Sequence, residues 1–177
     1  MTKNKVCMML CSLLLLVGCG STEDNEVVVK EYKEAISSEV FSDIAEDRGF
    51  EVIDYTDDAV EAFGEGNVNN TSIAFLDIFD ENEELIAAAA IEYYDLISNE
   101  EAETYYKFVT DEYTSRYSQL GEEKIIKKTG DNFKSFNIYN EDYWSFISMI
   151  DNTIILADLS NVSIDEIESF IEDIGYN

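Results

Sequence analysis

The sequence predicts an α+β domain with two layers, a mostly antiparallel sheet and helices packed on one of its faces. Segments of helical periodicity lie near both ends and in the middle of the chain, and runs of short alternating segments separate them. Within those runs, short turn signals such as Asp151-Asn152 indicate hairpins. Hairpin-linked strands grouped between helices favour an antiparallel sheet on which the helices stack.

The expected elements begin with a helix that Ser37 caps and Gly49 ends. Capping boxes open two further helices, with Ser98 before the long helix 99–120 and Ser163 before the terminal helix. The predicted strands are residues 50–55, 71–79, 85–94, 123–128, 133–139, 143–150 and 153–158, with a short helical turn over 56–63.

The segment Leu85 to Tyr94 has two interpretations. Ala87 to Ala90 have high helix propensity, so a helix from Glu83 onward is the alternative. We favour a strand because Ser98 and Glu101 form a capping box for a helix that starts only there. The small residues of such a strand would let a helix pack closely against the sheet.

The first twenty residues are typical of a secretory signal. Two lysines precede an apolar run, Val6 to Val17, which is too short to span a bilayer comfortably. The ending Leu16-Val17-Gly18-Cys19 resembles a bacterial lipobox, which a signal peptidase cuts before a lipidated cysteine. We therefore expect residues 1–18 to be a lipoprotein signal peptide and Cys19 to carry the lipid that holds the protein to the membrane. The alternatives are an uncleaved membrane anchor and a short buried hydrophobic segment.

Other features of the chain fit the same class. The helix around Phe41 ends in Gly49-Phe50, and the strand Ile91-Glu92-Tyr93-Tyr94 leads into a helix that contains Ala102. The chain closes with Ile174-Gly175-Tyr176. Together with the lipobox, these features resemble the small uncharacterised lipobox-containing lipoproteins of Gram-positive bacteria. The resemblance implies a single α+β domain at the cell membrane, facing outside the cytoplasm, and implies nothing about chemistry.

The expected organisation is a signal over 1–18, an acidic tether over 19–35 and one α+β domain over 36–177. The chain has 39 acidic and 11 basic residues and a formal net charge of −28. Nucleic acid would be repelled, because its binding depends on Lys and Arg that neutralise phosphates. Residues 101–140 are the one zone where an anionic ligand is conceivable, with Arg116, Lys124, Lys127, Lys128 and Lys134.

The composition excludes several kinds of catalysis. The chain has no histidine, and its three cysteines are Cys7, Cys11 and Cys19. Ser-His-Asp and Cys-His catalysis are therefore excluded, as are the usual zinc and iron ligand sets. We expect no catalytic residues and no cofactor.

Carboxylates are numerous enough to suggest two other activities. Asp77, Asp80, Asn82 and Glu84 could offer oxygen ligands to Ca²⁺, but EF-hand spacing and its central glycine are missing, so a solvated turn is favoured. An envelope hydrolase would need two carboxylates held about 5 to 10 Å apart in a cleft. No pattern in the sequence points to such a pair.

The remaining candidate site is aromatic. Tyr139, Tyr143 and Trp144 flank an acidic turn, and Trp144 is the only tryptophan. Aromatic rings on a hairpin can stack on sugars or anchor a peptide. Packing across the strands is the favoured explanation of the same residues. The sequence thus predicts a lipid-anchored, non-catalytic binding module for a protein, peptide or glycan. If Trp144 is buried and no exposed apolar patch is present, these aromatic residues are not the binding site.

Overall fold

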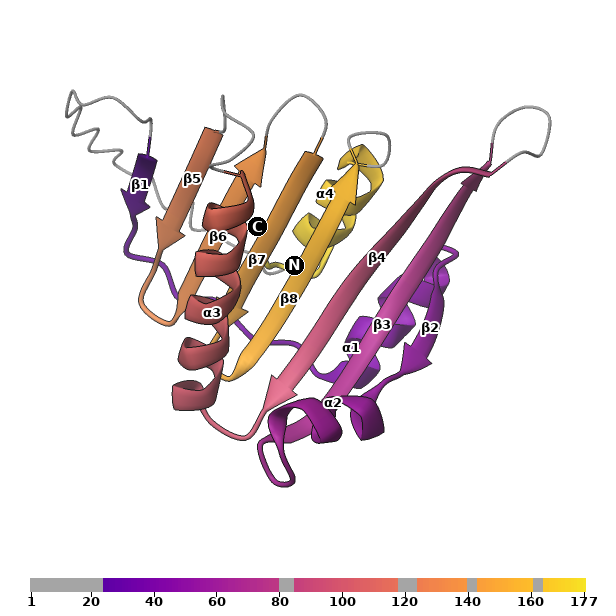
Figure 1. Cartoon of the computed structure of the whole chain (residues 1–177), viewed down its shortest axis with the longest axis horizontal. Coiled ribbons are helices and arrows are strands. Elements are labelled where there is room, and N and C mark those ends of the chain that lie inside the picture. The colour runs from indigo at the N-terminus through magenta and orange to yellow at the C-terminus, as the bar shows by residue number, and fades with distance from the viewer. Residues whose placement is uncertain (1–23, 80–84, 118–123, 140–142, 161–163) are drawn as a thin grey trace, which may run out of the picture.

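The computed structural model describes residues 24–79, 85–117, 124–139, 143–160 and 164–177. In this part of the chain, eight strands form one sheet and four helices pack against it (Figure 1). The elements are β1 (Asp24–Val28), α1 (Ser38–Asp47), β2 (Glu51–Asp54), α2 (Thr56–Phe63), β3 (Val68–Phe79), β4 (Leu85–Leu96), α3 (Asn99–Tyr117), β5 (Lys124–Thr129), β6 (Phe133–Tyr139), β7 (Tyr143–Ile150), β8 (Thr153–Ser160) and α4 (Ile164–Asp173).

The strands lie in the order β1-β5-β6-β7-β8-β4-β3-β2. Neighbours are antiparallel throughout, apart from the parallel pair β1 and β5 at one edge. The α+β class and the mostly antiparallel sheet predicted from the sequence are therefore confirmed. The strand interpretation of Leu85 to Tyr94 is confirmed too, because β4 runs through this segment and pairs with both β3 and β8.

Helices cover both faces of the sheet, so the domain has three layers where two were expected. One core cluster joins α1 and α4 to alternate strand residues, and includes Phe41, Phe170 and Ile155. The other joins α2 and α3 to the opposite strand residues, and includes Val109 and Ile154. The reason lies in the central strands: after its first residue, β7 is buried on both sides. A strand that is apolar on both faces needs cover on both, so the expectation of helices on one face alone is wrong.

Residues 24–35 belong to the folded domain, although the sequence predicts a tether there. Strand β1 pairs along its whole length with β5. Lys33 is only 8% exposed, and its ammonium group donates hydrogen bonds to the backbone carbonyls of Gly175, at 3.0 Å, and Asn177. Burial lowers the pKa of Lys33, and the nearby charge of Lys128 lowers it further. The N-terminal segment is thus bound to the C-terminal end of the domain.

The predicted hairpin at Asp151-Asn152 is present between β7 and β8. Asp151 has a φ of 50°, the left-handed backbone that two-residue hairpin turns require. Its amide N–H donates to the carbonyl of Asn132 at 3.0 Å, and the Asn132 side chain donates to the Asp151 carboxylate at 2.9 Å. These bonds hold the turn between β7 and β8 against the turn between β5 and β6.

Candidate functional site

The three aromatic residues predicted to contact a ligand do not form one exposed surface. Trp144 is 2% exposed, stacks on Phe146 and donates its indole N–H to the side-chain oxygen of Asn137 at 3.1 Å. Tyr139 lies directly opposite Trp144 and packs against the same core cluster. Tyr143 is exposed, and as the neighbour of Trp144 in the strand it points to the opposite face. Cross-strand packing therefore accounts for Trp144, whose ring faces are not available for stacking on a ligand.

The basic residues of the 101–140 zone do not gather into one positive patch. The register of β5 and β6 places Lys127 and Lys134 on the face that α3 covers, and Lys124 and Lys128 on the other. Each contacts a carboxylate or an aromatic ring: Arg116 pairs with Asp158, Lys134 with Glu103 and Lys128 with Glu31, while the ammonium groups of Lys124 and Lys127 lie over the rings of Tyr139 and Phe136. This dispersal weakens the case for an anionic ligand there.

The sequence-predicted cation site and lipid site lie mostly outside the described residues. Of the four oxygen-ligand candidates, only Asp77 is described, as an exposed residue of β3. Among the described residues, no group of three or more Asp, Glu, Cys or His side chains is arranged to hold a metal ion. Cys19 precedes the described part of the chain.

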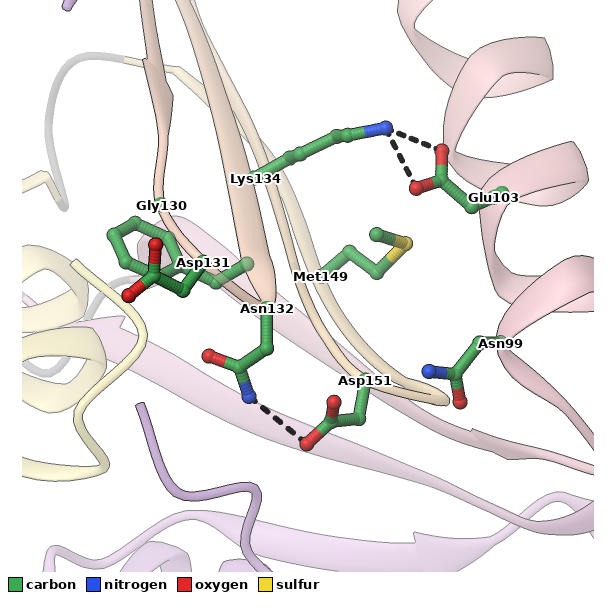
Figure 2. A pocket seen from close by; sticks show the side chains of 9 residues that line it. Asn99, Glu103, Gly130, Asp131, Asn132, Lys134, Met149 and Asp151 are labelled. Carbon is green, nitrogen blue, oxygen red and sulfur yellow. Dashed lines mark hydrogen bonds and ion pairs between the residues drawn. The ribbon is translucent and has the colours of Figure 1, made fainter. Parts of the chain in front are cut away.

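A pocket of about 260 Å³ lies where the first turns of α3 face the β5–β6 and β7–β8 turns (Figure 2). Lys134 donates to the Glu103 carboxylate at 2.6 Å on one side of it, and Asn132 donates to Asp151 on the other. Much of its polar lining is therefore bonded to itself. Ligand pockets are more often about 300–1,000 Å³, so this one suits at most a small molecule. The lining residues are Asn99, Glu103, Gly130, Asp131, Asn132, Phe133, Lys134, Met149 and Asp151.

Glu92 is a carboxyl group placed in the middle of the sheet. It is half-buried, and the hydroxyl of Tyr94 donates a hydrogen bond to it. Burial raises the pKa of Glu92 and the negative charge of Asp158 raises it further, while the bond from Tyr94 acts in the opposite direction. The rings of Phe63, Tyr94 and Tyr105 pack together beside it, with centroids 4.7 to 5.8 Å apart.

Asp158 lies on the same face of the neighbouring strand. Glu92 pairs with Leu156, so Asp158 is its diagonal neighbour, and such neighbours lie about 7–8 Å apart. Ser145 donates to the Asp158 carboxylate at 2.6 Å, and Arg116 forms an ion pair with it. Two carboxylates on neighbouring strands, of which Glu92 has a raised pKa, are the kind of pair that a two-carboxylate hydrolase uses. The sequence predicts neither the pairing of these carboxylates nor the raised pKa of Glu92. Its one signal is that Glu92 is a charged residue within an apolar strand.

On the side of the sheet that carries α2 and α3, the described part of the chain leaves the ends of β2, β3 and β4 remote from α2 without a covering helix. Figure 1 shows α3 crossing β6 to β8 and α2 near one end of β3, with no described helix over the far part of the β3–β4 hairpin. Cross-strand register places five apolar side chains on this surface, which we call the open face. Its members are Ile53, Ile73, Phe75, Ala88 and Ala90.

Along β3 and β4, exposure of the open face increases with distance from α2. Thr71 and Tyr94 are buried beside that helix, and Ile73, one step further along β3, is half-buried. Phe75 is 38% exposed and Ala88 is exposed too. The open face therefore continues the core cluster under α2 and α3 beyond the area that these helices cover.

Phe108 lies on the flank of α3 that faces β4. Glu103 reaches Lys134 in β6 from one flank of α3, while Tyr105 packs against Tyr94 in β4 from the other. Phe108 follows Tyr105 by three residues and so shares its flank. It is a large ring that is 60% exposed.

Comparisons with known proteins found no matching family model, no matching curated protein and no matching solved structure. Within the described residues, none of the helices combines the length and the apolar character that crossing a membrane requires.

Proposed function

We propose that this protein is a lipid-anchored, extracytoplasmic binding module whose binding surface is the open face. The observation that supports the surface is the contiguity of its apolar side chains across three strands. Apolar residues exposed singly are ordinary, whereas a continuous apolar surface on a soluble domain is typical of an interaction site. The exposed floor consists of hydrocarbon side chains, which suits a protein or peptide better than a glycan.

The anchor is supported by the sequence ending Leu16-Val17-Gly18-Cys19. Lipid on Cys19 would hold the protein at the outer side of the cell membrane, since two or more acyl chains give stable attachment. Mass spectrometry of the protein from its native cells should find Cys19 as the N-terminal residue with a diacylglycerol mass on its sulfur. An unprocessed N-terminus or a bare thiol at this position would contradict the proposal.

The binding surface can be tested by photo-crosslinking in native cells. A photoreactive phenylalanine analogue at position 75 should give a discrete protein adduct, and Ile53→Ser in the same chain should reduce it. The control position is Tyr32, which is 69% exposed and follows Glu31, whose carbonyl accepts the N–H of Asp131 in the β5–β6 turn, away from β2, β3 and β4. Absence of an adduct at 75, or the same adducts at 75 and 32, would count against the open face as the binding surface.

A second candidate function, hydrolysis, is favoured by the Glu92 and Asp158 pair alone. In this case Glu92, with its raised pKa, is the proton donor and Asp158 the second carboxylate. Assays on chromogenic glycosides should then show turnover that Glu92→Gln abolishes. Turnover that is absent, or that survives this substitution, would remove the hydrolase from consideration.

A further inference from the structure

We infer that the open face binds a basic amphipathic protein segment, in which Lys or Arg side chains flank a row of apolar ones. This inference rests on the proposed function and names the chemistry of its partner. The argument uses the charges on the open face, its relief, and the charge of the whole chain.

The described charged side chains that share the open face are carboxylates. Glu51 lies directly opposite Phe75 on β2, and Asp77 lies directly opposite Ala88. Both are exposed, and Glu92 follows Ala90 on the same face of β4. A purely apolar partner would remove water from these carboxylates without replacing its hydrogen bonds, which is costly. A partner with Lys or Arg at the matching positions replaces them with ion pairs and steers its own approach.

The basic residues of α3 do not cancel this acidic character. Lys107 forms an ion pair with Asp111 on the helix surface, and Arg116 forms one with Asp158. Each pair is neutral overall. The carboxylates of Glu51 and Asp77 therefore dominate the local potential, within a chain whose formal net charge is −28.

The relief of the surface suits the side chains of a helix. Ala88 and Ala90 lie two residues apart in β4 and both point to the open face. Because their side chains are small, they form a shallow strip along this strand. Phe75 lies beside this strip on β3, and Phe108 is exposed on the flank of α3 that faces β4. Apolar residues three and four positions apart on a partner helix could lie along the alanines beside Phe75.

Charge also decides against the other occupants. An anionic lipid surface or a nucleic acid would be repelled, since both require Lys and Arg on the protein. A second copy of this chain would bring Glu51 and Asp77 of both copies to one apolar contact, where like charges oppose association. A basic segment is the occupant that satisfies both the apolar floor and its carboxylates.

The test uses the full-length protein in nanodiscs of phosphatidylcholine and three fluorescent peptides of about 18 residues, or five helical turns. The first is an amphipathic Leu/Lys helix, the second is the same helix with Glu for Lys, and the third scrambles the first so that its apolar face is lost. Fluorescence anisotropy, corrected with empty nanodiscs, should give a dissociation constant for the first peptide at least tenfold below those of the others. Its affinity should fall as salt is added.

Variants locate the binding. Phe75→Ser and Phe108→Ser should each weaken binding of the Leu/Lys peptide tenfold or more, while Tyr32→Ser should leave it unchanged. Melting temperatures show whether each variant is folded. Glu51→Lys keeps the apolar floor intact and should weaken binding through charge alone, so it serves as a second variant if Phe75→Ser unfolds.

Three results would overturn the inference: equal or tighter binding of the Glu peptide, no binding of the Lys peptide, and losses that are the same for Phe75→Ser and Tyr32→Ser. An adduct from cross-linking at position 75, together with no binding of the Lys peptide, would refute the basic partner and leave the binding surface standing. Absence of both would refute the two together. Sedimentation that shows dimers lost in Phe75→Ser would assign the face to a second copy and also refute the inference.

Discussion

Neighbouring alanines in β4 give the sharpest test of the open face. Ala89 is buried in the core cluster under α1, whereas Ala88, one residue earlier, is exposed on the open face. The same substitution, alanine to leucine, can be made at both positions. Both residues lie in β4, so any general effect of leucine on this strand is shared by the two variants. The two side chains point to opposite faces, so the variants differ in what the leucine meets.

The expected magnitudes differ clearly. Extra methylene groups in a packed core cost about 1–3 kcal/mol, and α1 lies directly against β4 on the Ala89 side. Exposed substitutions away from special features usually change stability by about 0.5 kcal/mol or less. For a chain of this size, about 1 kcal/mol moves the melting temperature by roughly 2–4 °C. Ala89→Leu should therefore lower the melting temperature by about 2–12 °C, and Ala88→Leu by no more than about 2 °C.

Thermal unfolding followed by circular dichroism, with both variants and the parent chain in one buffer, measures the difference. Equal destabilisation of the two variants would mean that the Ala88 side is covered in the native protein, and the open face would then not exist. A neutral Ala89→Leu would refute the tight packing of α1 on this strand. Only the asymmetric result agrees with the structure.

Three further predictions concern residues outside that pair. The fluorescence of Trp144 should be that of a buried indole and should resist quenching by acrylamide, and efficient quenching would contradict its place in the core. Lys33→Met should lower the free energy of unfolding by about 1–3 kcal/mol because two backbone carbonyls lose a charged donor, while the exposed neighbour Lys30, changed in the same way, should have little effect. Equal effects at the two lysines would refute the docking of this segment. The folded-state pKa of Glu92 is raised above its usual 4.5, so its contribution to stability is full below pH 4.5 and is lost as the pH rises through the raised pKa. Denaturant titrations at several pH values should show this decline in the parent chain. The decline should be weaker in Glu92→Gln.

Local signals were sufficient to predict most of the secondary structure. Ser37 and Ser98 accept hydrogen bonds from the backbone N–H groups of Val40 and Glu101, as the capping patterns predict. The hairpin turn at Asp151 adopts the left-handed backbone expected of it. These signals act over three or four residues, so the sequence alone contains all that is needed to find them.

Features that depend on distant residues were missed. The apolar patch Val27-Val28-Val29 is short and lies in a polar, acidic stretch, and its pairing depends on β5, about a hundred residues away. The burial of Lys33 depends on carbonyls at Gly175 and Asn177, which no local pattern can reveal. The Glu92 and Asp158 pair likewise exists only because β4 and β8 are neighbours in the sheet.

The helices on both faces could have been inferred from β7. The segment Trp144 to Ile150 is apolar or small at every position, which is typical of a strand covered on both sides. Trp144 itself illustrates the difficulty of assigning a role to a single aromatic residue. Its neighbours in the sequence include the acidic residues Glu141 and Asp142, while its neighbours in space belong to a core cluster.

The parallel pairing of β1 has a consequence for where the domain would stand at the membrane. Only four residues lie between Cys19 and Asp24, the start of this edge strand, so a lipid on that cysteine would keep the strand within at most about 18 Å of its attachment point. Strands β3 and β2 lie at the other edge, and β3 is six strand spacings away, or roughly 29 Å. A short linker at one edge of the sheet would thus leave the opposite edge accessible to partners away from the bilayer.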